Sequence, residues 1–231
     1  SSSPILGMAG VGDLESENLI KILDYMREGR INDAVKLALT SSLKTVRYAV
    51  TYADKYLSFE GATKFYNAVK ARVQEYVKAA LGIEMPLELP HGWTDKVKEL
   101  LSDIAVDDYH KARGYEFIEI PKYDGHVARG VISRDRLIRL LPHMPVTILF
   151  DRQNEAPMFL DFIDVNCEGA YYDIYIVGSR RWDERVTIDG IYLPIECDDE
   201  LTTLLKSALG SPDELRHVTI NNKLYVNAWW D

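Results

Sequence analysis

The chain has 231 residues and carries 27 Lys and Arg against 36 Asp and Glu, a formal net charge of −9. Hydrophobic residues make up 47% and charged residues 27%, which is typical of a globular protein. These values exclude a collagen, a coiled coil, a disordered tail and a protein that coats DNA through general basic charge. No segment reaches the roughly 20 consecutive apolar residues of a membrane-spanning helix, so we expect no membrane association.

The first half of the chain has the apolar spacing of amphipathic helices. The opening residues 1–12 are small and lack the pattern of a secretory signal, so we expect a flexible N-terminus there. Apolar residues then recur at intervals of three and four, and Gly29 and Gly82 follow two of the segments as stop signals. The helical segments are 19–26, 31–38, 43–57, 62–80 and 97–104. Five such helices joined by short loops predict a helical bundle domain over residues 13–113.

From Tyr115 onward the apolar period changes from 3.6 to 2. Three dipeptides that favour two-residue hairpin turns lie in this half: Asp124-Gly125, Asp189-Gly190 and Asn221-Asn222. Pro121 lacks a backbone N–H, which places the first strand at an edge or makes it end early. We expect further strands near 145–150, 157–165 and 170–177, and short helices near 134–141 and 198–209. The fold class is therefore α+β, with an N-terminal all-α bundle followed by an antiparallel α+β domain over residues 114–231.

The second half also contains a possible repeat in its order of elements. A hairpin dipeptide, a Leu-rich helix and a Val-Thr-Ile strand follow one another twice, starting at Asp124 and at Asp189. This order predicts a duplicated ββαββ unit. The alternative is coincidence, because hairpins and Leu-rich helices are common elements.

The cysteine and amide content bears on the compartment. Cys167 and Cys197 are too few for a disulfide framework and fit a reducing, cytoplasmic interior, with a single bond between them as the alternative. Gln occurs only twice, at positions 74 and 153. Because depletion of thermolabile amides is a tendency of thermophiles, a hot-environment origin is a hypothesis.

No catalytic signature is present in the sequence. The chain has no G-x-S-x-G, no phosphate-binding glycine loop and no clustered His or Cys with zinc-ligand spacing. Asp161 and Asp164 are three residues apart, which on a strand would place them on opposite faces. We therefore expect a non-catalytic protein with no cofactor and no metal site.

Aromatic residues give the leading functional hypothesis. Tyr48, Tyr52 and Tyr56 recur every four residues, on a different helix face from the apolar stripe of segment 43–57. Burial inside the bundle is the alternative interpretation. Strand alternation would send Trp229 and Trp230 to opposite faces, so one of them would be available to a partner. These residues predict an interaction or assembly protein that binds a protein partner or self-associates.

Two other functions remain open. Residues 31–57 have the outline of a helix-turn-helix with Lys44 and Arg47 near the start of its second helix, and this pattern predicts nucleic-acid binding. A cluster of arginines supports the same alternative, namely Arg129, Arg134, Arg136 and Arg139. The second alternative is a small-molecule or metal-dependent enzyme site in a cleft of the C-terminal domain, containing Asp161, Asp164 or His126.

Overall fold

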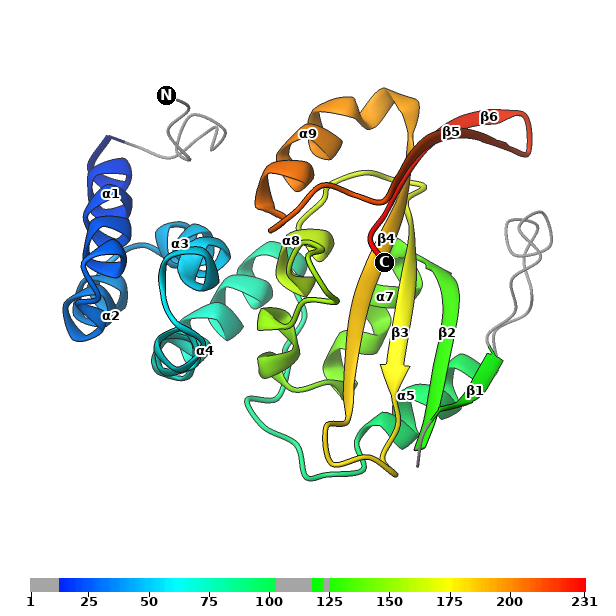
Figure 1. Cartoon of the computed structure of the whole chain (residues 1–231), viewed down its shortest axis with the longest axis horizontal. Coiled ribbons are helices and arrows are strands. Elements are labelled where there is room, and N and C mark those ends of the chain that lie inside the picture. The colour runs from blue at the N-terminus through cyan, green and yellow to red at the C-terminus, as the bar shows by residue number, and fades with distance from the viewer. Residues whose placement is uncertain (1–12, 103–117, 123–124) are drawn as a thin grey trace. The chain divides into compact units, whose positions relative to one another are not determined.

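The computed structural model describes residues 13–102, 118–122 and 125–231 (Figure 1). The chain divides into two compact units, Ser1–Leu87 and Glu88–Asp231. This division lies upstream of the boundary that we expected at residue 113, because the fifth helix belongs to the second unit. The expected flexible segment 1–12 lies outside the described residues. Within the described part of the chain, no helix combines the length and apolarity needed to cross a membrane.

The described part of the first unit is built from four helices, as the apolar spacing predicts. Helix α3 packs against α1 and α4, and α2 packs against the same two helices. The bounds of the helices are α1 (Asp13–Arg27), α2 (Ile31–Thr40), α3 (Leu43–Tyr56) and α4 (Phe59–Leu81).

Local side-chain contacts fix the helix ends in this unit. The Ser42 hydroxyl accepts a hydrogen bond from the Thr45 amide at 3.2 Å, and Ser58 accepts one from the Gly61 amide at 3.1 Å. Both serines satisfy backbone donors that a helix N-terminus leaves without partners. Gly82 ends α4 in the left-handed conformation, with φ of 69°, which glycine adopts without the steric penalty of a Cβ atom.

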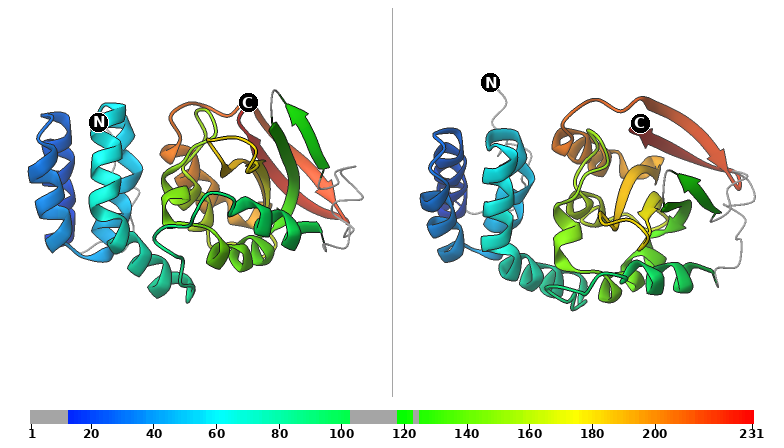
Figure 2. Two further views of the ribbon diagram at one scale, coloured as in Figure 1. Left: turned by 90° about the horizontal axis from the view of Figure 1, so that it is seen from below. Right: turned by 60° about the horizontal axis from the view of Figure 1, so that its bottom comes forward.

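In the described residues of the second unit, six strands form one sheet in the order β1-β2-β3-β4-β6-β5, and every neighbouring pair is antiparallel. Helices α7 and α8 lie against one face of this sheet (Figures 1 and 2). The strands are β1 (Ile118–Lys122), β2 (Gly125–Ser133), β3 (Tyr171–Val177), β4 (Arg185–Pro194), β5 (Glu214–Ile220) and β6 (Lys223–Trp229). The helices are α5 (Thr94–Ser102), α7 (Arg134–Leu140), α8 (Phe159–Ile163) and α9 (Asp198–Ser207). The predicted α+β class, with helices first and an antiparallel sheet second, is confirmed.

An aromatic cluster forms part of the core on the helix-covered face of the sheet. Phe162 of α8 makes edge-to-face contacts with Tyr172 and Trp230, at centroid distances of 6.2 and 6.1 Å. The polar atoms of both partners are satisfied, since the Tyr172 hydroxyl donates to the Phe162 carbonyl at 2.8 Å and the Trp230 indole donates to the Gly210 carbonyl at 2.9 Å. This buried cluster of three aromatic rings thus joins α8 to β3 and to the last residues of the chain.

Two of the predicted strands are helical. Segment 145–150 forms a 3₁₀ helix, η3 (Val146–Phe150), and segment 157–165 forms α8. Their apolar side chains are buried almost without interruption, so the sequence shows no alternation that separates a strand from a buried helical turn. Asp161, expected on a strand, instead uses its carboxylate to accept a hydrogen bond from the Met158 amide at the start of α8, at 3.2 Å.

The Asp189-Gly190 dipeptide is not a turn. Strand β4 runs through it, and the register with β3 pairs Gly190 with Asp173 and Ile188 with Ile174, which leaves Asp189 as the extra residue of a β-bulge. The actual connection between β3 and β4 is the loop 178–184. With one hairpin absent and segment 145–150 helical, the predicted ββαββ duplication is not present.

Of the other two predicted hairpin turns, one is present and the other lies partly outside the described residues. Asn221 and Asn222 have φ of 51° and 63° and join β5 to β6, as a type I′ turn requires. Strands β1 and β2 pair as expected, with β1 at an edge of the sheet. Asp124, the first residue of their expected turn, lies outside the described residues.

The two cysteines form a disulfide bond between Cys167 and Cys197. The expectation of reduced thiols is therefore wrong for this structure, and the single bond that the sequence left open is present. The bond joins residues 30 positions apart, which constrains the unfolded chain and stabilises the fold by about 3–4 kcal/mol.

Gly190 is needed for close packing at the bulge. A Cβ at this position would overlap the Asp173 carboxylate and lie 3.0 Å from Cδ1 of Trp229. We predict that Gly190→Ala lowers the free energy of unfolding by about 1–3 kcal/mol, measured by urea denaturation. The double variant Asp173→Ala/Gly190→Ala should recover part of this loss, and a fully additive double variant would show that the two residues do not compete for space.

Candidate binding site

The predicted tyrosine face is largely covered. Tyr52 is 9% exposed, and Tyr48 and Tyr56 are half-buried. Tyr52 and Tyr56 stack with ring centroids 6.2 Å apart, and the Arg27 guanidinium of α1 lies over Tyr56 at 4.4 Å from the ring centroid. These rings therefore make contacts within the first unit and do not project as a free aromatic stripe.

The two tryptophans at residues 229 and 230 have different surroundings, as strand alternation predicts. Trp230 is 1% exposed and packs on Phe162 in the core, so it offers no surface to a partner. Trp229 is half-buried on the opposite side of the strand, against Gly190.

The residues predicted for nucleic-acid binding do not form one basic surface. Lys44 at the start of α3 is exposed, but Arg47 is 5% exposed and donates to the Thr51 hydroxyl at 2.7 Å. A recognition helix needs its first basic residues directed outward, and Arg47 does not meet this requirement.

The arginines of segment 129–139 are distributed over two elements. Arg129, on β2, lies 3.7 Å from the Asp189 carboxylate. Arg134, at the start of α7, donates to the backbone carbonyls of Val165 and Ile163, after and at the end of α8. Arg136 and Arg139 lie further along α7, and Arg139 donates to the Asp135 carbonyl. Part of this cluster thus holds the fold together.

The acidic residues considered for an enzyme site are also dispersed. Asp161 caps the start of α8, Asp164 lies at its end, and His126 lies on β2 opposite Pro121. Among the described residues, no group of three or more His, Cys, Asp or Glu side chains is placed to hold a metal ion.

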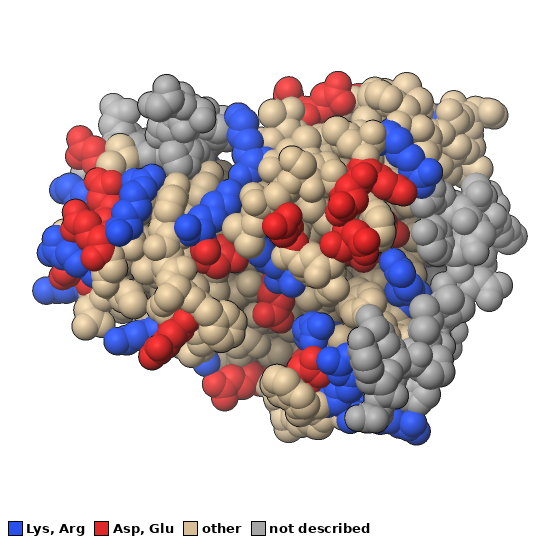
Figure 3. All heavy atoms as spheres, viewed as in Figure 1, with Lys and Arg blue, Asp and Glu red and all other residues tan. Residues whose placement is uncertain are grey.

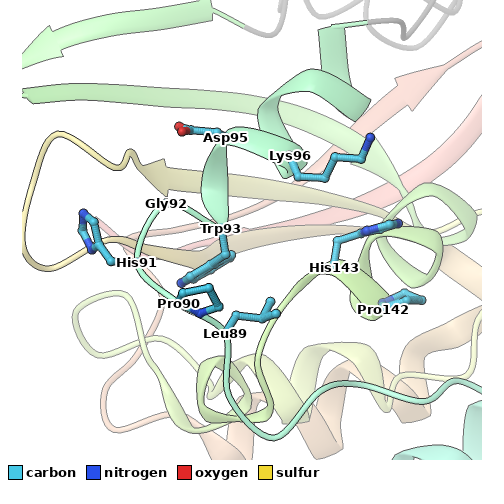
Figure 4. A pocket seen from close by; sticks show the side chains of 9 residues that line it. All are labelled: Leu89, Pro90, His91, Gly92, Trp93, Asp95, Lys96, Pro142 and His143. Carbon is cyan, nitrogen blue, oxygen red and sulfur yellow. The ribbon is translucent and has the colours of Figure 1, made fainter.

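A pocket that the sequence analysis did not identify lies in the second unit (Figure 4). Its volume is about 520 Å³, within the range of small-molecule and peptide side-chain sites. The segment before α5 and the first turn of α5 form most of its wall, and the 3₁₀ turn after α7 forms the rest. The lining residues are Leu89, Pro90, His91, Gly92, Trp93, Asp95, Lys96, Pro142 and His143.

The carboxylate of Glu184 holds the pocket wall in place. This side chain is 2% exposed and comes from the end of the loop between β3 and β4. One carboxylate oxygen accepts from the Thr94 amide at 2.8 Å and the Thr94 hydroxyl at 2.6 Å, and the other accepts from the Gly92 amide at 2.8 Å. The acidic group therefore satisfies free backbone donors at the N-terminus of α5 and complements the helix dipole there.

His91 adds a second link between this wall and the loop. Its Nδ1 lies 3.1 Å from the Glu184 carboxylate, and its Nε2 lies 2.6 Å from the Ser179 carbonyl. Both partners are acceptors, so the protonated imidazolium, which donates from both nitrogens, satisfies this arrangement. The Ser179 hydroxyl in turn donates to the Asp95 carboxylate at 2.7 Å.

The loop held by these bonds, residues 178–184, presents an exposed tryptophan, and we call it the Trp182 loop. The Trp182 side chain is 91% exposed. Beside it, Arg181 forms a bidentate pair with Asp183 at 2.8 and 2.6 Å, and Arg185 also contacts Asp183 at 2.7 Å. The indole thus projects from a loop whose neighbouring side chains are fixed.

Sequence reasoning missed both features for identifiable reasons. The pocket combines residues about 50 positions apart, 89–96 and 142–143, which no local motif connects. The signal for the loop was a tryptophan between charged residues, Arg180-Arg181-Trp182-Asp183, in a segment that separates two apolar runs. A large aromatic residue in such a turn has no strand face to pack against.

A buried carboxylate lies on the face of the sheet opposite α8. Asp189, the bulge residue, is 5% exposed, and its Oδ1 atom is buried without a hydrogen-bond partner. Burial raises the pKa of Asp189 to about 6, although the Arg129 charge and a hydrogen bond from Trp229 oppose the shift. Figure 3 shows acidic side chains gathered on this face beside the C-terminus.

Comparisons with protein-family models, with curated proteins and with solved structures find no match.

We predict that Glu184→Gln destabilises the second unit. The amide keeps one acceptor but places its NH₂ group against backbone or hydroxyl donors, so we expect the free energy of unfolding to fall by about 2–4 kcal/mol. Urea denaturation measures the change. The control is Glu99→Gln on the exposed side of α5, which should change stability by less than about 0.5 kcal/mol. Equal effects of the two substitutions would contradict the role given to Glu184.

We also predict a pH-dependent gain in stability for Asp189→Asn. The folded chain holds this proton more tightly than the unfolded chain between pH 4 and 6, since the pKa rises from 3.8 to about 6 on folding. Stability therefore falls as the pH rises through that window, and the loss persists above it. Asn does not ionise, so the variant should gain up to roughly 3 kcal/mol relative to wild type between pH 4 and pH 8.

The measurement is urea denaturation of both proteins at pH 4 and pH 8. Burial also raises the pKa of Asp151 to about 6. Asp151 is present in both proteins, so the variant keeps the part of the pH dependence that Asp151 causes. A stability difference between variant and wild type that is the same at both pH values would contradict the raised pKa of Asp189.

Proposed function

We propose that this chain is a non-catalytic binding protein that engages a protein partner, or a second copy of itself, through the Trp182 loop and the adjacent pocket. The observation that carries the proposal is the 91% exposure of Trp182 on a loop whose neighbours are fixed by hydrogen bonds. A partner is the explanation that this exposure favours, because tryptophan is among the residues most enriched at binding hot spots.

The fixed geometry of the loop supports the same proposal. Ser179 bonds to Asp95 and Glu184 bonds to Gly92 and Thr94, so both ends of the loop are attached to the segment that begins α5. A loop that is already held in place loses little conformational entropy on binding. The binding surface proposed from the sequence thus moves from the tyrosines of α3 to the Trp182 loop.

Nucleic-acid binding receives less support from the geometry. Arg47 and Arg134 are engaged by Thr51 and by backbone carbonyls, and the other predicted cations are distributed over α3, β2 and α7. The net charge of −9 also opposes nonspecific attraction to a phosphate backbone.

The disulfide bears on the proposed cytoplasmic location. Such bonds are rare in the cytosol of mesophiles but common in intracellular proteins of hyperthermophiles. The Cys167–Cys197 bond and the low Gln content are thus compatible with a cytoplasmic protein from a hot environment. In a mesophile the same bond would favour an oxidising compartment.

The test of the proposed function compares Trp182→Ala with Phe59→Ala. Phe59 is 90% exposed at the start of α4, so the two variants remove equally exposed aromatic rings from different units. We expect Trp182→Ala to weaken capture of a partner protein at least tenfold, while Phe59→Ala leaves capture unchanged. The measurement is quantitative mass spectrometry of proteins retained by the immobilised full chain.

Self-association is measured in parallel by sedimentation of the two variants and the wild-type chain. Neither variant should alter the thermal unfolding midpoint, because both rings are exposed. If Trp182→Ala matches wild type in both partner capture and sedimentation, the proposed function is wrong.

A further inference from the structure

The chemistry of the pocket wall indicates which group of a partner enters it. Leu89, Pro90, Trp93 and Pro142 supply apolar surface, and Trp93 is half-buried beside Pro90 (Figure 4). These residues have little freedom to lose, since proline is rigid and the segment is held by Glu184. The apolar part of the pocket therefore suits a flat or branched hydrocarbon group of side-chain size.

The polar part of the pocket has two ends of different character. Asp95 lies at one end, where its carboxylate already accepts the Ser179 hydroxyl. Lys96 and His143 extend toward the other side, away from the Asp95 carboxylate (Figure 4). Lys96 is 51% exposed and pairs at 3.5 Å with Glu99, whose side chain is 69% exposed. Such an exposed pair is weak, so the ammonium group can exchange Glu99 for another anion.

His143 strengthens this end as a site for an acceptor group. Its side chain is half-buried, and within the described part of the chain it makes no hydrogen bond or ion pair. An imidazole N–H donates to a carboxylate in either the neutral or the charged form. The N-terminus of α5 is not available for this purpose, because Glu184 already occupies its free amides.

We propose that the pocket binds a carboxylate carried next to an apolar or aromatic group. The hydrocarbon part lies on Trp93 and the prolines, and the carboxylate accepts from Lys96 and His143. This inference deepens the proposed function, since the same Glu184 bonds hold the pocket and the Trp182 loop. On a protein partner, the matching element is an acidic residue beside an aromatic one. A free aryl carboxylate has the same chemistry.

The first experiment uses phenylacetate and phenylacetamide, which have the same shape and differ in charge. The titration of the full chain is followed by NMR through the indole N–H resonance of Trp93. This resonance is assigned by its absence from the spectrum of the Trp93→Phe variant. We expect phenylacetate to bind up to about fivefold more tightly than the amide, the preference that one solvent-accessible ion pair supplies. Equal binding of the two probes, or no binding of either, would overturn the proposal.

Two variants assign the preference to the pocket. Lys96→Met keeps the length of the side chain and should reduce the affinity for phenylacetate to that for the amide, while His143→Gln should reduce it partially. The control is Lys64→Met, which removes an exposed lysine from α4 and should change nothing. Because Lys96 is exposed, its replacement should leave the fold intact, as circular dichroism will verify. An unchanged preference in Lys96→Met would reject the assignment.

A third experiment, with peptides, distinguishes a carboxylate on a protein partner from a carboxylate on a free small molecule. N-acetyl-Phe-Glu-amide is compared with N-acetyl-Phe-Gln-amide and with phenylacetate. Tighter binding of the Glu peptide than of phenylacetate supports the pocket as a site for a protein partner, and equal or weaker binding supports it as a site for a free acid. If phenylacetate discriminates but Trp182→Ala retains partner capture, the pocket assignment stands and the proposed function fails.

Discussion

A single buried carboxylate organises the pocket wall and the Trp182 loop of this molecule. Glu184 accepts hydrogen bonds from the Gly92 amide and from the Thr94 amide and hydroxyl, and it faces the imidazole of His91. A buried charge is unfavourable unless it is surrounded by donors, so the loop and the start of α5 adopt the arrangement that supplies them. The position of the pocket wall and the orientation of the Trp182 loop both follow from this requirement.

The surroundings of the aromatic rings explain why the surface that we propose for binding differs from the one expected from the sequence. Tyr52 and Tyr56 are positioned by cation contacts from Lys55 and Arg27, and Trp230 is enclosed with Phe162. Aromatic rings have a strong tendency to find such partners within their own chain. Among the residues that the structure describes, none makes such a contact with Trp182 in the loop between β3 and β4, and we propose that a partner covers its exposed ring.

The sequence predicted the parts of the fold that local chemistry determines. The helices of the first unit follow from the 3.6-residue apolar spacing together with Ser42, Ser58 and Gly82 at their ends, and the turn at Asn221-Asn222 follows from its positive φ angles. The short helices at 146–150 and 159–163 did not follow, because a fully buried run has no period. Asp189-Gly190 was identified as exceptional, but its glycine serves the close approach of Asp173 and Trp229 and not a turn. The pocket depends on tertiary contacts alone and had no local signal.

The Cys167–Cys197 bond has a consequence for the loop that carries Trp182. Strand β3, the loop and β4 all lie between the two bonded residues, so they form a covalently closed ring of chain. Exposed loops are the usual sites of proteolytic nicking, and Arg180 and Arg181 are residues that trypsin-like enzymes recognise. A cut at this point would leave both fragments tethered through sulfur, and they would separate only when a reductant and unfolding conditions act together.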